Sequence, residues 1–182
     1  MKTKRFVWIN LTAMSLFAFT LAALTGASGA QGEPGPAATL VETVRRATER
    51  FQNVEEAIAA GYADAGTCVS GIEEGAMGVH FGNGTLLSDS VLDAERPEIL
   101  VYEPKNGQLH LVAVEYVVDA AAWDANNATT PSLLGQLFHY GGSPNRYGVP
   151  PVYELHVWAW KHNPNGMFAD WNTKVSCKEY AP

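Results

Sequence analysis

Three ionisable residues stand in the middle of segments that otherwise consist of apolar residues. His80 and His156 each have a large apolar residue on both sides, and Glu115 follows a run of leucine, valine and alanine. An unpaired carboxylate in a protein core is strongly destabilising, so Glu115 must be neutral, paired or bound to a cation. The same question arises for the two imidazoles.

Two histidines and one carboxylate form the donor set of several transition-metal sites. They make up the facial triad of Fe(II) enzymes, and the same ligand types bind Zn(II) and Cu(II). The sequence therefore offers His80, Glu115 and His156 as ligands of a divalent zinc, copper or iron ion. The alternative is a core hydrogen-bond network in which the carboxylate orients an imidazole. No short metal-binding motif links the three residues, so both interpretations stay open.

Four further residues are candidates for the wall of a ligand cavity. In a strand over 153–160, Trp158 and Trp160 share a face with His156, and Tyr116 offers a hydroxyl group. Met77 lies three residues before His80, and its thioether suits Cu(I). Core packing is the alternative role for each of these side chains.

The elements that must position these residues are mainly β-strands. Strand-like composition covers residues 77–82, 98–103, 108–118 and 153–160. The Asn106-Gly107 pair predicts a hairpin turn between the second and third strands. Alternation along 108–118 places Leu109, Leu111, Ala113, Glu115 and Val117 on one face.

One amphipathic helix precedes the strands. Apolar residues from Leu40 to Ile58 recur at steps of three and four, which places them on one helical face. Asn53, with Glu56 three residues later, predicts a cap that breaks the helix there, and Gly61 predicts its end. Together these elements predict an α+β fold, in which the helix packs on a curved antiparallel sheet.

A long segment, residues 119–152, joins the last two predicted strands and is rich in Ala, Asn, Gly and Pro. A structureless connection of this length is often a lid or binding loop, so we expect a cavity beneath it. An exposed surface loop is the alternative.

The N-terminus has the layout of a secretory signal. Basic residues precede an apolar run from Phe6 to Leu24, and small residues up to Ala30 follow. We expect a signal peptide over 1–30, a flexible leader over 31–38 and a single domain over 39–182. An uncleaved membrane anchor is the lesser alternative. The expected location is secreted or periplasmic.

Charge and cysteine content follow from this division. Residues 31–182 carry 9 basic and 19 acidic side chains, a net charge of −10, which excludes a basic stripe for nucleic acid. Cys68 and Cys177 are the only cysteines, and in an exported chain we expect them to form a disulfide. A metal site shared by the two thiols is the alternative.

Several strings carry a resemblance to known sequences. They are GAMGVHF at 75–81, PEILVYEP at 97–104, VEY at 114–116 and LHVWAWKHNPNGMF at 155–168. On these strings the chain resembles a family of uncharacterised exported bacterial proteins, over nearly all of the sequence after the signal. The resemblance implies a bacterial source and a secreted single domain, and it implies no reaction.

Three functions remain open at this level. The first is a secreted or periplasmic domain that holds a transition metal through His80, Glu115 and His156. The second is a metal-free module that binds a small molecule, or an acid–base enzyme with Glu115 and His156 as its proton-handling pair. The third is a structural envelope protein whose buried polar residues only fix the core. Composition and spacing do not decide whether the chain is an enzyme, what its oligomeric state is or which residues would be catalytic.

Overall fold

The computed structural model describes residues 35–145 and 148–181. The predicted signal peptide and the first half of the predicted leader, residues 31–34, lie outside these residues. The helices are α1 (Pro36–Thr48), the 3₁₀ turn η1 (Glu49–Gln52), α2 (Val54–Ala59), α3 (Gly84–Asp89) and α4 (Ala120–Asp124). The strands are β1 (Tyr62–Ser70), β2 (Ala76–Asn83), β3 (Ile99–Lys105), β4 (Gln108–Asp119), β5 (Ser132–Leu133), β6 (Gln136–Leu137), β7 (His139–Gly141) and β8 (Val152–Val157).

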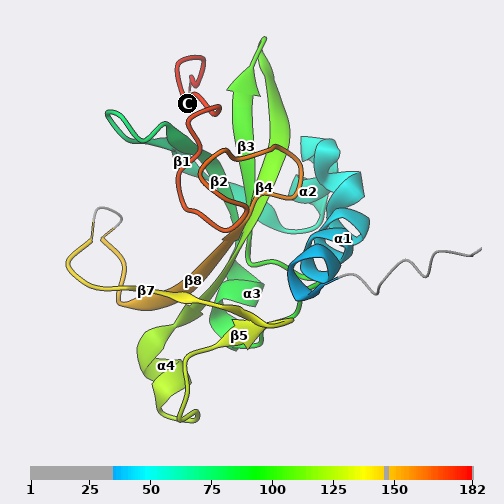
Figure 1. The fold of residues 1–182 in the computed structure, drawn as a ribbon. Coiled ribbons are helices and arrows are strands. Elements are labelled where there is room, and N and C mark those ends of the chain that lie inside the picture. Colours follow the sequence, from blue (N-terminus) through cyan, green and yellow to red (C-terminus); the bar gives the residue numbers. More distant parts are fainter. Residues whose placement is uncertain (1–34, 146–147, 182) are drawn as a thin grey trace, which may run out of the picture. The chain divides into compact units, whose positions relative to one another are not determined.

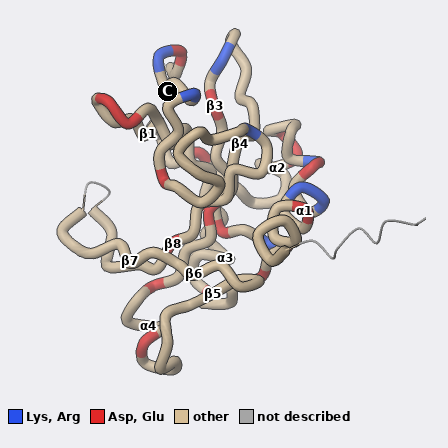
Figure 2. Tube along the Cα trace, viewed as in Figure 1, with Lys and Arg blue, Asp and Glu red and all other residues tan. Residues whose placement is uncertain are grey.

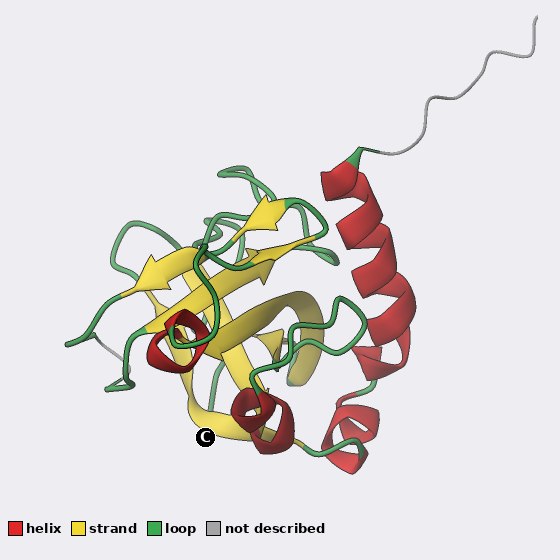
Figure 3. Ribbon diagram, turned by 90° about the horizontal axis from the view of Figure 1, so that it is seen from below, coloured by secondary structure: helices red, strands yellow, loops and turns green. Residues whose placement is uncertain are grey.

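The predicted α+β arrangement is confirmed. Six strands form one sheet in the order β1-β2-β3-β4-β8-β7, and each neighbouring pair is antiparallel. Helix α1 runs along one side of this twisted sheet, and the C-terminal segment lies on the other side (Figures 1 and 3). Strands β5 and β6 form a separate small hairpin. Among the described residues, no helix has the length and apolar character needed to cross a membrane.

The N-terminal helix buries its apolar stripe against the sheet. Leu40 and Val44 are fully buried and pack with Tyr102, Tyr116 and other residues of the main core. The predicted break occurs at Asn53, whose side chain caps α2 by accepting a hydrogen bond from the Glu55 amide. The helix begins at Pro36, inside the segment predicted as a leader, because proline is well suited to the first helical turn.

The tip of the β3–β4 hairpin follows the sequence prediction. Asn106 and Gly107 have φ values of 53° and 71°, as the two central residues of a tight hairpin turn require. The alternation predicted along β4 is wrong at one point, because the strand contains a β-bulge. Val101 faces Ala113 while Tyr102 faces Leu111, so Val112 is an extra residue.

The bulge changes which side chains of β4 lie on each face of the sheet. On the hairpin side of the bulge, Leu111 packs into the helix-covered core together with Val114 and Tyr116. Val112 and Ala113 instead belong to a second apolar cluster with Trp158 and Val175. Leu109 and Leu111 therefore do not share a face with Ala113 and Glu115, contrary to the prediction.

The second face of the sheet is covered by the C-terminal segment. A disulfide between Cys68 of β1 and Cys177 joins residues 109 positions apart in the chain, as predicted. Asn172 adds an isolated bridge to Ala76, with backbone hydrogen bonds of 3.1 and 3.2 Å in the two directions. These links hold the C-terminal residues against β1 and β2.

Three other sequence predictions need correction. Strand β1 was not predicted, because its small and polar residues are mostly exposed at a sheet edge and give no apolar alternation. Strand β8 ends at Val157 and does not continue to residue 160. The segment 119–152 is not structureless, since it contains α4, the β5–β6 hairpin and β7.

Candidate metal centre

The sheet register places the three predicted ligands on one face. Glu115 of β4 lies directly opposite His156 of β8 and, on its other side, opposite Ile99 of β3. His80 of β2 lies opposite Val101 of β3. Directly opposed residues point to the same side of a sheet, so the two histidines and Glu115 converge over β3 on the face away from α1.

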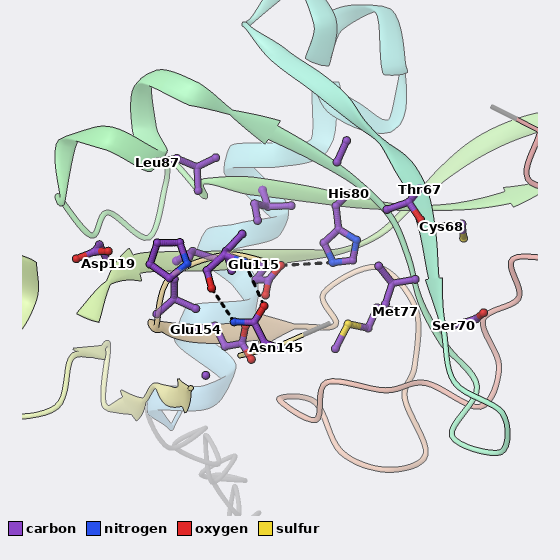
Figure 4. A pocket seen from close by; sticks show the side chains of 18 residues that line it. Thr67, Cys68, Ser70, Met77, His80, Leu87, Glu115, Asp119, Asn145 and Glu154 are labelled. Atoms are coloured by element: carbon purple, nitrogen blue, oxygen red, sulfur yellow. Dashed lines mark hydrogen bonds and ion pairs between the residues drawn. The ribbon is translucent and has the colours of Figure 1, made fainter. Parts of the chain in front are cut away.

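The side-chain ends of these residues meet. The Nε2 atom of His80 lies 3.5 Å from one carboxylate oxygen of Glu115, and the Nδ1 atom of His156 lies 3.7 Å from the other. One ligand atom from each residue can be chosen so that all three lie within 4.8 Å of one another. Figure 4 shows His80 and Glu115 facing each other at the cavity wall.

Burial keeps both imidazoles neutral at neutral pH. It lowers the pKa of His80 to about 4 and that of His156 to about 3. A neutral imidazole is the form that binds a metal ion. The two histidines thus present lone pairs without first having to lose a proton.

Each histidine is held in place by a neighbour. Nδ1 of His80 lies 3.2 Å from the carbonyl oxygen of Gly78, and a proton donated there leaves Nε2 as the acceptor that faces Glu115. Orientation through the second ring nitrogen is usual for metal-binding histidines. His156 stacks on Trp158, with ring centroids 5.5 Å apart and an interplanar angle of 22°.

One nitrogen of His156 lacks a partner. Its Nε2 atom is buried and makes no hydrogen bond to any described residue. Buried polar atoms without a partner are rare in folded proteins, and each needs an explanation. A core network that existed only to satisfy His156 would not leave this atom unpaired.

Glu115 sits in an environment that disfavours a bare carboxylate. Burial raises its pKa well above the usual range, and the neighbouring carboxyl groups of Glu154 and Asp170 raise it further. Glu154 of β8 is hydrogen-bonded to Glu115, and burial raises its pKa as well. The buried Glu103, by contrast, accepts hydrogen bonds from Lys161 and from the Ser176 amide. Glu115 therefore has carboxyl and imidazole groups as neighbours, whereas the buried carboxylate of Glu103 has a lysine.

A cavity of about 790 Å³ opens beside His80 and Glu115. Strands β1, β2, β3, β4 and β8, helix α3 and the segment 141–152 all contribute to its lining. The expected cavity beneath the long connection is therefore present, and Gly141, Asn145, Val149 and Pro150 form that part of its wall.

Of the four residues predicted to line a ligand cavity, only Met77 does so. Met77 is buried and lines the cavity, near His80 in Figure 4. Trp158 does not line it, but supports His156 from behind and donates a hydrogen bond from Nε1 to the Ala169 carbonyl oxygen.

Trp160 and Tyr116 lie in the helix-covered core, away from this cavity. Trp160 donates to the Thr48 hydroxyl group at the end of α1, and Tyr116 donates to the Ala94 carbonyl oxygen. Trp160 and His156 lie on different faces because the chain leaves the sheet after Val157. The amides of Trp160 and Lys161 both donate to the Val112 carbonyl oxygen at the bulge.

Sequence reasoning missed Glu154. It lies two residues before His156 in a predicted strand, so alternation alone places both side chains on one face. His139 is an exposed residue of β7, opposite Glu154, and its Nδ1 atom lies 3.4 Å from Oδ1 of Asp170. No sequence pattern connects His139 with Asp170.

Comparison with known proteins gives no functional assignment. No family model matches the chain, and neither a curated protein nor a solved structure matches it.

The arrangement fits a metal ion bound on the cavity wall. Two imidazole nitrogens and one carboxylate oxygen leave at least one coordination position for water or another molecule, as in catalytic zinc sites and Fe(II) facial triads. The three residues come from three strands of one sheet, which is a rigid support for such a site.

Proposed function

We propose that this protein binds one divalent transition-metal ion through His80, Glu115 and His156 and presents its open coordination position to the cavity. The observation that carries the proposal is the convergence of three ligand atoms within 4.8 Å in a buried setting. The absence of a described cation beside Glu115 supports it.

Zinc, iron(II) and copper(II) all accept this donor set, and the residues alone do not rank them. When bound, the ion would supply a Lewis acid at the cavity wall. The protein's own part is to hold the two imidazoles neutral and oriented and to limit the access of water. The partner of the metal-bound protein is then a small molecule in the cavity, and catalysis on it is a further step that the site permits.

We place this activity outside the cytoplasm. A disulfide that spans 109 residues persists in an oxidising compartment, and the N-terminal sequence has the pattern of an export signal. The acidic character of the chain argues against a nucleic-acid partner.

The test is metal binding by the purified protein with its disulfide intact. Protein stripped with a chelator and dialysed against Zn²⁺ or Co²⁺ should retain one equivalent by elemental analysis, and the visible spectrum of Co²⁺ should report low-symmetry coordination. His80→Gln and Glu115→Gln should each lower the affinity by about tenfold to a hundredfold or more.

A matched control is available on the same sheet. His110 is an exposed histidine of β4 outside the three-residue group. His110→Gln should leave metal affinity unchanged. If the wild type retains no metal, or if His80→Gln binds as well as His110→Gln does, the proposal is wrong.

The two alternative functions, a metal-free binding module and a structural protein, predict different results. A metal-free binding module would retain no metal, yet its melting temperature would rise with a small organic molecule. A structural role would show destabilisation by Glu115→Gln with no response to metals or small molecules.

A further inference from the structure

The cavity beside the metal centre is far larger than a metal ion and its water ligands require. At about 30 Å³ for each water, a volume of about 790 Å³ corresponds to roughly 25 water molecules. Cavities of this size bind small organic molecules in other proteins. The dimensions therefore point to an organic ligand.

The wall next to Glu115 is aliphatic. Ile99 is its direct cross-strand partner, and Val117 follows it by two residues on the same face of β4. Farther out, Leu87 of α3 and Val149 and Val152 of the segment 141–152 complete an apolar surface. A molecule that reaches the metal position must pass along these side chains.

The polar groups of the wall are largely engaged within the protein. Asp119 caps α4 by accepting a hydrogen bond from the Ala122 amide at 2.8 Å, and Glu154 is hydrogen-bonded to Glu115. Gly141 contributes no polar side chain. These contacts leave the aliphatic surface as the main feature that a ligand meets.

The ionisable groups of the wall are mainly carboxyl groups. Its charged or ionisable side chains, among the described residues, are Glu115, Glu154, Asp119 and His80, and neither lysine nor arginine is among them. Figure 2 shows the same for the neighbouring elements, since no Lys or Arg lies along β7 or α4. An anionic group on a ligand would find no counter-ion among these side chains, so only the bound metal ion could balance its charge.

We infer that the ligand of this site is a predominantly apolar organic molecule whose uncharged body lies along Ile99, Val117 and Leu87 and which places one donor atom at the open metal position. The inference deepens the proposed metal function and rests on it for the donor atom. The apolar part of the ligand site depends on the cavity alone, so the two can fail separately.

The cavity is tested first in the metal-free protein with two matched fluorescent probes. N-phenyl-1-naphthylamine is neutral, and 8-anilinonaphthalene-1-sulfonate is nearly the same molecule with a sulfonate. The neutral probe should bind about tenfold tighter or more, a difference of about 1.4 kcal/mol. Equal or tighter binding of the sulfonate would overturn the inference.

Substitutions on the cavity wall test whether the neutral probe binds there. Leu87 and Val149 are partly exposed, so Leu87→Asp and Val149→Asp place a charge on the wall without burying it in the core. Each should weaken the neutral probe by about tenfold. Val91→Asp is the control, because Val91 is also exposed but lies outside the cavity lining. An equal effect of all three variants would contradict the assignment.

The donor atom is tested with Co²⁺-loaded protein, imidazole and 4-phenylimidazole. Both compounds should shift the cobalt spectrum, and the phenyl compound should bind about tenfold tighter because its ring contacts the aliphatic wall. Equal affinities would overturn the inference and leave the metal function intact. If no cobalt binds, the metal function and the donor-atom part both fail, and the neutral probe alone decides the apolar part.

Discussion

Glu115 and His156 are direct partners across the β4–β8 pair, and their side chains meet with Oε1 3.7 Å from Nδ1. His80 reaches the other carboxylate oxygen from two strands away. The geometry of the group is therefore fixed by backbone register in a hydrogen-bonded sheet. Mutations that disturb this register, even at residues that are not ligands, should change the site.

Gly78 is one such residue. Its φ is +125°, a Cβ atom there would lie 2.5 Å from the Tyr102 carbonyl oxygen, and its own carbonyl oxygen lies 3.2 Å from Nδ1 of His80. Gly78→Ala should destabilise the protein by about 3 kcal/mol or more and also weaken metal binding. Urea denaturation and Zn²⁺ titration of the same sample measure both effects.

The control for this prediction is Gly66→Ala. Gly66 has a positive φ of +77°, but nothing lies within 4 Å of an added Cβ atom. The loss of stability should be only about 1–2 kcal/mol, and metal affinity should not change. Equal effects of the two substitutions would show that the close approach of Gly78 to β3 is unimportant.

The buried carboxyl group of Glu98 should make the stability of the protein depend on pH. Burial raises its pKa from 4.5 to about 7, so between these pH values the folded state keeps a proton that the unfolded state has lost. The protonated carboxyl group contributes fully to the stability of the folded state below pH 4.5, and this contribution is lost as the pH rises to 7.

The substitution Glu98→Gln removes this titration. The Gln side chain can still accept the hydrogen bond that the Val117 amide donates to Glu98. Relative to the wild type, the variant should gain roughly 2–3 kcal/mol of stability as the pH rises through this range. Chemical denaturation at several pH values measures the difference, and a difference independent of pH would contradict the raised pKa.

Thr48 and Trp160 link the N-terminal helix to the sheet. The Thr48 hydroxyl donates to the Val44 carbonyl oxygen at 2.7 Å and accepts from Nε1 of Trp160 at 3.0 Å. Thr48→Val keeps the shape but leaves the indole N–H unpaired, and it should cost about 1–3 kcal/mol. In a double-mutant cycle with Trp160→Phe the two effects should be less than additive.

Metal binding should be unaffected by these two substitutions, because Trp160 packs on the helix side of the sheet. A change in metal affinity without a change in stability would place Trp160 near the metal site after all.

The disulfide between Cys68 and Cys177 should contribute substantially to stability. Cross-linking residues 109 positions apart restricts the unfolded chain by about 4–5 kcal/mol in the chain-entropy model. The double variant Cys68→Ala/Cys177→Ala should lose an amount of this order in urea denaturation. Wild-type protein treated with reductant should match the double variant, and unchanged stability in both would contradict the estimate.

The sequence was sufficient to predict the helix, four of the strands and the three candidate ligands. Each of these carries a local signal, such as apolar periodicity, an Asn-Gly turn or a charged residue among apolar ones. Strand β1 carries none, because an exposed edge strand needs few apolar residues. Its presence depends on pairing with β2, which is a tertiary effect.

The spacing of the three candidate ligands along the sequence did not predict that their side chains would converge. His80, Glu115 and His156 come together because β3 lies between β2 and β4 and because β8 pairs with β4. The wrong positions expected for Trp160 and Leu111 have a common cause, since the bulge at Val112 and the end of β8 lie side by side. Period-two alternation contains no information about where a strand will be interrupted.

The bulge at Val112 also has a consequence for how the length of this chain can vary. Two residues added to or removed from the hairpin tip around Asn106 would preserve the side-chain alternation on both sides of the bulge. A single-residue deletion at Val112 would instead remove the bulge and join Leu111 to Ala113 in regular alternation, with Leu111 still opposite Tyr102 and Ala113 still opposite Val101. Homologous chains could therefore lack this one residue and keep the metal site, whereas a single-residue change elsewhere in β4 would turn one end of the strand over.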